Sequence, residues 1–103
     1  NFSDAQVTIS NNSLTDIVTA SNKSLVIAGT MSNTTSSSIN VTLKKYDASA
    51  TATFTILNTI PLPSGSSLEL PKIVLQTSDK IQAQSDNSSG HLTVALQMLT
   101  DVS

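Results

Sequence analysis

Residues 36–63, SSSINVTLKKYDASATATFTILNTIPLP, contain two runs in which every second side chain is apolar. The alternating apolar residues are Ile39, Val41 and Leu43 in the first run and Phe54, Ile56 and Ile60 in the second. Because successive side chains of a strand point to opposite faces, each run predicts a strand with one apolar face. The polar link at residues 46–50 is short enough to reverse the chain, which predicts a hairpin with both apolar rows on one face. A two-stranded ribbon is marginal in water, so a second layer must cover it.

The remaining strand signals predict that second layer. Short apolar-polar alternations, separated by turn sequences at roughly ten-residue spacing, occur at residues 5–10, 14–20, 25–33, 68–70, 73–76, 81–85 and 91–99. In these runs Val7, Ile9, Leu14, Ile17, Ile81, Ala83, Leu92, Val94, Leu96 and Met98 are expected to point inward. The pattern predicts an all-β fold, an antiparallel β-sandwich of about eight short strands that is immunoglobulin-like or jelly-roll-like in architecture. A small barrel is the alternative.

The strand expected at residues 25–33 is apolar on both faces. Leu25, Ile27 and Met31 alternate with Val26 and Ala28. This predicts a central strand covered on two sides. The glycine within it, at position 29, marks a bulge or a close backbone approach.

Size and composition predict one domain. The chain has 103 residues, of which 38% are hydrophobic and 12% charged, about half the usual charged share. We expect an N-terminal arm (residues 1–4) and first strand within residues 1–10, and a single sandwich domain over residues 11–103. The net charge of -2 does little to keep particles apart, which favours a protein that lives in an assembly.

Several function classes lack support in the sequence. The basic residues do not cluster apart from Lys44 and Lys45, so no nucleic-acid partner is expected. No apolar run approaches about 18 residues, so no membrane partner is expected. The chain has no cysteine, hence no disulfide framework and no thiolate site.

Candidate catalytic groups are sparse. His91 is the only histidine, and neither a nucleophile nor a set of metal ligands stands near it in the sequence. The carboxylates, Asp4, Asp16, Asp47, Glu69, Asp79, Asp86 and Asp101, are scattered. Three aromatic residues offer little for stacking on sugars. We therefore expect no enzyme, no cofactor and no metal site.

Six Asn-x-Ser/Thr triplets begin at Asn1, Asn11, Asn22, Asn33, Asn40 and Asn87. As glycosylation acceptors they would imply secretion. Most of them stand at predicted turns, where asparagine is favoured because it tolerates left-handed backbone. We interpret them as turn residues.

The whole pattern resembles small virion structural proteins of tailed bacteriophages. The matching residues, within a resemblance that covers residues 14–99, are Asn33-Thr34, Val41-Thr42-Leu43, residues 60–68, Leu75, Asp79, Ile81, Ala83 and residues 94–96. One departure is Ser78, where the family pattern has a glycine before the aspartate. The resemblance implies a non-enzymatic virion protein, assembled in the bacterial host cytoplasm.

The role that the resemblance implies is capsid decoration: a cement protein docked on the major capsid protein. A component of the neck, tail or fibre attachment is the alternative within the particle, and a carbohydrate or host-surface binding module is the alternative outside that class. Other virion proteins are the expected partners, and a homo-oligomer such as a trimer is expected. Asn1, Phe2, Ser3 and Asp4 are the predicted partner-binding residues, because this segment has little apolar content to hold it on its own core.

Overall fold

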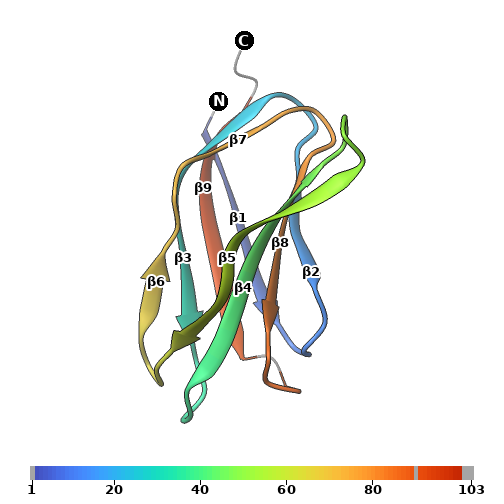
Figure 1. Cartoon of the computed structure of the whole chain (residues 1–103). Coiled ribbons are helices and arrows are strands. Elements are labelled where there is room, and N and C mark those ends of the chain that lie inside the picture. Colours follow the sequence, from blue (N-terminus) through green and yellow to red (C-terminus); the bar gives the residue numbers. More distant parts are fainter. Residues whose placement is uncertain (1, 90, 101–103) are drawn as a thin grey trace.

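The computed structural model describes residues 2–89 and 91–100. In this part of the chain nine strands and no helix are found, arranged as two layers (Figure 1). The strands are β1 (Phe2–Ile9), β2 (Thr15–Thr19), β3 (Ser24–Asn33), β4 (Ile39–Asp47), β5 (Ala52–Leu62), β6 (Ser67–Glu69), β7 (Ile73–Leu75), β8 (Lys80–Ser85) and β9 (Leu92–Leu99).

The strands form two antiparallel sheets. In the first sheet the order is β1-β9-β3-β6, and β7 also pairs with β3. Because β9 occupies one edge of β3, β6 and β7 share the other edge, β7 beside the start of β3 and β6 beside its end. The second sheet has the order β2-β8-β4-β5. The predicted all-β antiparallel sandwich is confirmed.

The core lies between the two sheets, where alternate side chains of each strand meet. β9 contributes Leu92, Val94, Leu96 and Met98, all buried, as the alternation predicts. From the second sheet come buried side chains of β4 and β8, namely Ile39, Val41, Leu43, Ile81 and Ala83. The period-two signal therefore identifies most of the core correctly.

The predicted hairpin is β4 and β5, but its second apolar row is only partly inward. The pairing runs from Ile39 opposite Leu62 to Asp47 opposite Ala52, with two register shifts next to Leu43. A bulge moves the following residues relative to the core. Phe54 lies opposite Lys45 on the inner side of the sheet, but it stands at the open side of the sandwich and is 53% exposed, so the burial predicted for it is wrong.

A second irregularity changes the faces of β3. The register of β3 against β9 shifts between Val26 and Ala28, and Val26 and Met31 are the buried apolar residues of the strand. Leu25 thus belongs to the opposite, outer face, which the second sheet does not cover. The prediction of a strand covered on both sides is wrong. Leu14, expected to point inward, is 38% exposed.

The N-terminal segment is not a free arm in the described residues. β1 begins at Phe2 and pairs along its whole length with β9, from Phe2 opposite Leu99 to Ile9 opposite Leu92. The prediction of an arm at residues 1–4 is therefore wrong for residues 2–4, which belong to a paired strand. Asn1 lies outside the described residues.

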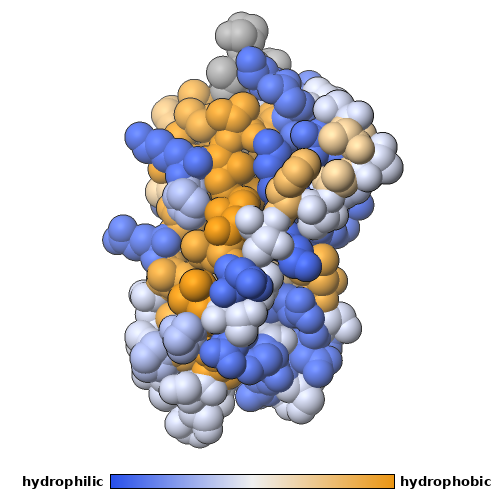
Figure 2. Space-filling model, in the orientation of Figure 1, coloured by the Kyte–Doolittle hydropathy of each residue, from blue (hydrophilic) through white to orange (hydrophobic). Residues whose placement is uncertain are grey.

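One side of the sandwich is open. In the described part of the chain no ladder joins β5 to β6 or β7, and Figure 2 shows a band of apolar residues running along the molecule on this side. Polar contacts tie the two sheets together at both ends of it. Lys45 Nζ donates to the carbonyl oxygen of Val74 at 2.7 Å, and Asn33 Nδ2 donates to that of Leu62 at 2.9 Å.

Candidate interaction surface

The predicted partner-binding residues open an edge strand. β1 forms one edge of the first sheet, with β9 as its only neighbour in that sheet. Phe2 lies opposite Leu99 and Asp4 opposite Gln97, so both belong to the outer face, the face turned away from the second sheet. Ser3 lies opposite the buried Met98 on the inner side. Phe2 is 82% exposed and is the most exposed large hydrophobic residue described.

Four large apolar residues form one cross-strand line on this outer face. Phe2 is paired with Leu99, Leu99 with Leu25, and Leu25 with Val74. Directly opposed residues of antiparallel strands lie about 5 Å apart, so the four side chains are neighbours. Val74 is 48% exposed, and Leu25 and Leu99 are half-buried. We call Phe2, Leu99, Leu25 and Val74 the apolar row.

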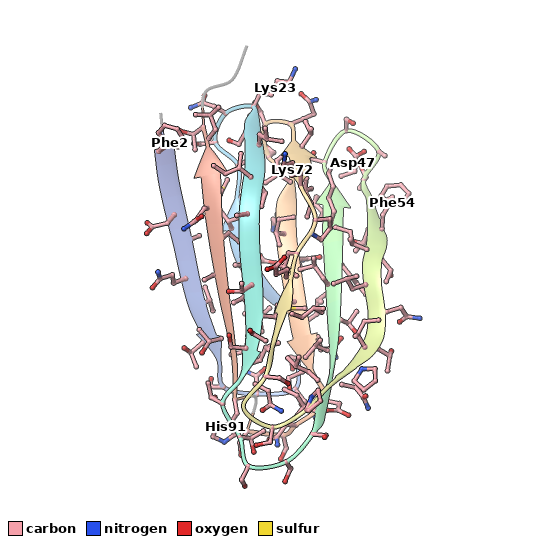
Figure 3. All side chains as sticks on the ribbon, turned by 90° about the vertical axis from the view of Figure 1, so that its left-hand side faces the viewer. Phe2, Lys23, Asp47, Phe54, Lys72 and His91 are labelled. Carbon is pink, nitrogen blue, oxygen red and sulfur yellow. The ribbon has the colours of Figure 1, made fainter. Side chains whose placement is uncertain are left out.

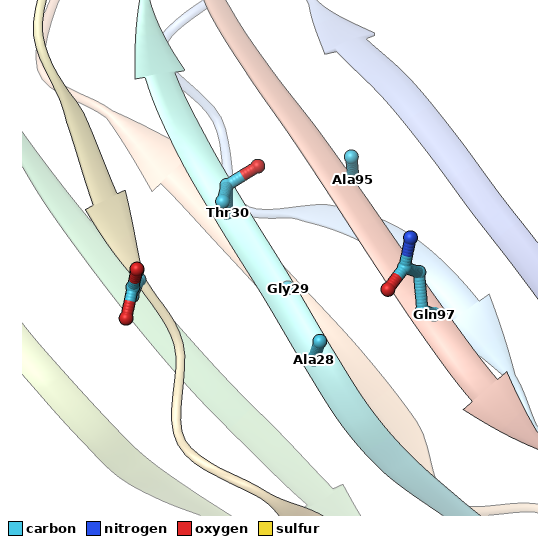
Figure 4. A pocket seen from close by; sticks show the side chains of 6 residues that line it. Ala28, Gly29, Thr30, Ala95 and Gln97 are labelled. Atoms are coloured by element: carbon cyan, nitrogen blue, oxygen red, sulfur yellow. The ribbon is translucent and has the colours of Figure 1, made fainter.

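A shallow depression lies on the same face, farther along the strands (Figure 4). It measures about 290 Å³ and is lined by Ala28, Gly29, Thr30, Glu69, Ala95 and Gln97. Most of these side chains are small, which explains why the surface sinks here. We call this depression the hollow.

Gly29 lies on the inner side of β3, opposite the buried Leu96. A Cβ atom at this position would lie 2.9 Å from Cδ2 of Leu96 and 3.1 Å from the carbonyl oxygen of Ala95. Both distances are too short for ordinary contacts. The sequence signal for close backbone approach at position 29 is therefore confirmed, whereas the bulge of this strand lies between Val26 and Ala28.

Charged residues of both signs border the apolar row and the hollow. Lys23 and Lys72 lie at the same end of the molecule as Phe2 (Figure 3), while Asp4 and Glu69 lie on the outer face itself. All four side chains are exposed. Within residues 2–89 and 91–100 none of them forms an ion pair. Their charges are thus available to a partner.

The outer face of the second sheet has a different character. The registers place Asp16, Lys44, Tyr46, Lys80, Gln82 and Gln84 there. Lys80 Nζ lies 3.3 Å from Asp16 Oδ2 and 5.8 Å from the centre of the Tyr46 ring. A hydrogen bond from Gln82 Nε2 and the nearby ammonium of Lys80 hold the pKa of Asp16 below its ordinary value, against a smaller opposing effect of burial. This face is polar, and Lys80 and Gln82 both contact Asp16 on it.

His91 contacts Thr34 through its backbone. It is exposed, follows the loop before β9, and has a φ of 54°. Its carbonyl oxygen accepts hydrogen bonds from the backbone N–H and the hydroxyl of Thr34. In the part of the chain that the structure describes, no three His, Cys, Asp or Glu side chains are grouped as metal ligands would be.

The carboxylates act in local structure. Asp79 is buried and accepts backbone hydrogen bonds from Ala48 and Gln76. Asp86 accepts from the backbone and side-chain nitrogens of Asn40. Hydrogen bonds from Ser49 and Ala50 lower the pKa of Asp47. Asp101 lies outside the described residues.

The asparagines of the Asn-x-Ser/Thr triplets differ in accessibility. Asn33 is buried, and its side-chain nitrogen donates to the carbonyl oxygens of Ser37 and Leu62, so it is closed to modification in the folded chain. Asn11 and Asn87 each accept a hydrogen bond from the backbone nitrogen two residues later, which is the turn geometry expected of them.

Comparison with known proteins yields structural likeness only. No family model and no curated protein matches the chain. Two crystal structures of a pentameric capsid protein isolated from metagenomic phage sequences resemble this chain. Each is 19% identical to it in sequence, and the TM-scores are 0.49 and 0.48. This chain is covered to 97% in both, but it spans only 60% and 62% of those chains.

A third solved structure comes from Bacillus endospore appendages, described as a novel family of disulfide-linked pili. It is 18% identical with a TM-score of 0.53, covering 94% of this chain and 83% of that one. The likeness shows that the two chains share a fold.

Within the described residues no helix has the length and hydrophobicity needed to cross a bilayer.

Sequence reasoning found one end of this surface and missed the rest. Phe2 and Asp4 were singled out, but Leu25, Val74 and Leu99 were not. The signal was present in the strand at residues 25–33, which is apolar on both faces. A second apolar face predicts that something covers it, either another layer of the same chain or a partner, and the sequence alone does not distinguish the two.

Proposed function

We propose that the chain is a non-enzymatic structural subunit of a virus particle, specifically a decoration or cement protein that docks on the major capsid protein of a tailed bacteriophage. The observation that carries this is the contrast between the two outer faces. One bears the apolar row, with Phe2 82% exposed and Val74 48% exposed, and the other bears internally paired polar groups. A line of exposed apolar side chains is typical of a surface that binds another protein.

The free edge of β1 supports docking as well. An edge strand presents backbone N–H and C=O groups that can pair with a strand of another chain. β1 carries Phe2 and Asp4 on its outer face, so backbone pairing and side-chain contact would occur together. Weak single contacts of this kind add up when a subunit attaches at many equivalent positions.

The test is the copy number and symmetry of this chain in purified particles. Quantitative mass spectrometry against the major capsid protein is expected to give many copies in a fixed ratio, and a cryo-electron microscopy map is expected to place them on the capsid lattice. A few copies at a single vertex would instead indicate a neck, tail or fibre-attachment component. Absence from the particle would overturn the proposal.

Carbohydrate or host-surface binding is the other candidate. Tyr46 and Asp16 on the polar outer face of the second sheet are residues of the kind that bind sugars. However, the Lys80 ammonium already lies over the Tyr46 ring. A sugar would have to displace it to stack there. Specific signals on a glycan array that disappear in Tyr46→Ala would favour this second function.

A further inference from the structure

We propose that copies of this chain assemble side by side, so that β1 of one copy lies over β5 of the next and beside its β6 and β7. The inference concerns self-assembly and does not depend on the virion role. It rests on the two narrow sides of the sandwich. One is the open side, formed by β5, β6 and β7, and the other is the β1–β2 side opposite it.

β5 extends beyond the first sheet at the open side. Figure 3 shows the first sheet face on, and its strands end before Phe54 on β5 is reached. The inner side of β5 carries Phe54, Leu57 and Ile60, which are paired with inner residues of β4. Leu43 of β4 is fully buried, whereas its partner Leu57 is half-buried and Phe54 is 53% exposed. The chain itself therefore leaves the apolar inner face of β5 only half covered.

β1 has the complementary position on the opposite side. It is the border strand of the first sheet, where it pairs only with β9. Ala5 and Val7 occupy its inner side, opposite buried residues of β9. Those partners, Leu96 and Val94, are at most 1% exposed, but Ala5 and Val7 are only half-buried. β1 thus also has an apolar inner face without complete cover.

The two half-covered strands fit together when neighbouring copies have the same orientation. β1 and β3 are both antiparallel to β9, and β6 and β7 are antiparallel to β3. β1 of the next copy is therefore antiparallel to β6 and β7, which continues the antiparallel order of the sheet. In this position Ala5 and Val7 face β5, so two apolar surfaces cover each other.

Side chains along the two edges match level by level. Phe2 and Val74 are the ends of the apolar row, so they lie at one level on opposite edges of the sheet. Asp4 is opposite Gln97. Extending the pairing of β7 with β3 by one residue places Lys72 level with Gln97 as well, at the bulge of β3. Copies in the same orientation therefore bring Phe2 against Val74 and Asp4 against Lys72.

The contact between Asp4 and Lys72 joins two opposite charges. Both side chains are exposed, and neither forms an ion pair with a residue that the structure describes. Opposite charges at matching positions fix the register of an interface and speed association. The other charge of this edge, Glu69, is level with the neutral Gln6, so like charges do not oppose each other along β1.

A two-fold contact through one side alone would cover less apolar surface. Two open sides facing each other would leave Phe2, 82% exposed, without cover. Two β1–β2 sides facing each other would leave Phe54 and Val74 exposed. The side-by-side contact covers all three side chains. Because each copy keeps one unused side, such a heterologous contact continues into a ring or a filament.

The size of the contact predicts that a single contact is weak. β1 has eight residues and is about 26 Å long, and the molecule measures 19 Å in its shortest dimension. The resulting area of about 500 Å² on each partner is below the standard of about 800 Å² and falls in the class of weak contacts. We expect a Kd between about 1 µM and 1 mM for one contact, and stronger association where many copies are held together.

The decisive experiment mixes two charge variants and follows association by analytical ultracentrifugation. Asp4→Lys puts two cations into the contact and Lys72→Glu puts two anions there, so each variant alone is expected to raise Kd about tenfold. In an equimolar mixture the substituted lysine meets the substituted glutamate, and the natural Asp4 meets the natural Lys72. The mixture is therefore expected to regain a Kd within about twofold of the wild-type value.

Three results of this experiment would overturn the arrangement. One is a mixture that associates as weakly as the separate variants. Another is an effect of Lys72→Glu without any effect of Asp4→Lys, which would indicate a two-fold contact through the open side. The third is a wild-type chain that stays monomeric at millimolar concentration.

Further variants test the cover over β5. Phe54→Lys removes the exposed phenylalanine from the inner side of β5 and is expected to raise Kd about tenfold. Thr55→Lys is the matched control, because Thr55 is the next residue on the opposite face of the same strand, and little change is expected. Equal effects of the two would contradict the contact.

Lys44→Glu is the control for Lys72→Glu. It makes the same charge change on the outer face of β4, a strand with neighbours on both sides, and is expected to leave Kd unchanged. Thermal unfolding of every variant verifies that the fold is intact.

Crosslinking distinguishes the side-by-side contact from a two-fold contact. The natural chain has no cysteine, and Gln6 and Glu69 are exposed and level with each other on opposite edges. With a short bis-maleimide, the double variant Gln6→Cys with Glu69→Cys is expected to give a ladder of dimers, trimers and larger species. Each single variant is expected to give none. Crosslinked dimers of a single variant would show that like edges meet and would refute the proposal.

Discussion

Lys45 in the second sheet and Val74 in the first are joined by a hydrogen bond of 2.7 Å from the ammonium to the backbone carbonyl oxygen. The same ammonium lies 3.6 Å from the buried carboxylate of Asp79. In the described residues no strand pairing closes this side of the sandwich. One lysine therefore links the two layers and compensates a buried charge at the same time.

Lys45→Met is predicted to lower the free energy of unfolding by about 2 kcal/mol, because hydrogen bonds to charged groups contribute about 1.5–3 kcal/mol. Methionine retains the apolar part of the side chain, so the loss reports the polar contacts. Urea unfolding followed by circular dichroism measures it. The control is Lys44→Met, which is on the outer face and is expected to change stability by less than about 0.5 kcal/mol. Equal losses in both variants would refute the role of Lys45.

Asp79→Asn is predicted to cost about 2 kcal/mol. Asp79 is 1% exposed and uses its two oxygens separately, one toward the backbone nitrogen of Ala48 and one toward that of Gln76. An asparagine can accept only one of these bonds, which leaves a buried N–H facing an NH₂ group. Asp86→Asn is the comparison, because Asp86 is exposed and water can replace its lost acceptor. Chemical denaturation should rank Asp79→Asn clearly below Asp86→Asn in stability.

Ser78→Gly is predicted to raise stability by about 1 kcal/mol, because a left-handed residue other than glycine costs about 1–2 kcal/mol. Ser78 has a φ of 74° in the turn closed by the hydrogen bond from Asp79 N to the carbonyl oxygen of Gln76. It is also the position where the resemblance to phage virion proteins leads one to expect glycine. The control is Ser36→Gly, an exposed loop residue without positive φ, where added backbone freedom should be neutral or slightly destabilising. A melting temperature of Ser78→Gly at or below that of the wild type would contradict this account.

The strands and most of the core could be predicted from the sequence because their signals are local. The alternation in residues 92–98 and 39–43 reports which side chains face inward without any knowledge of the partner strand. The turn residues behave similarly: the Asn11 side chain accepts the local hydrogen bond from Ser13 N, and Gly65 has the positive φ that glycine tolerates because it lacks a Cβ atom.

The faces of β3 and β5 could not be predicted, because they depend on register shifts between distant segments. The bulge near Val26 shifts the faces of β3 and puts Leu25 on the outer face. The apolar row depends on the pairing of Phe2 with Leu99, residues from opposite ends of the chain. Neither relationship leaves a local sequence signal.

Asp16→Asn is predicted to reduce stability at neutral pH and to lose that effect in acid. The hydrogen bond from Gln82 and the charge of Lys80 lower the folded-state pKa of Asp16 below 3.8, its ordinary value. A group with a lowered folded pKa contributes stability above its unfolded pKa, and the contribution disappears as the pH falls through the folded pKa.

The expected difference in unfolding free energy between wild type and Asp16→Asn is at most about 0.5 kcal/mol, because Asp16 is about half exposed and the pair is screened by solvent. The difference should be constant from about pH 5 to 8 and should shrink below about pH 4. Thermal unfolding at a series of pH values measures it, and adding salt at pH 7 should reduce it because exposed ion pairs are screened. A difference that grows on acidification would show that Asp16 is not stabilised as a carboxylate.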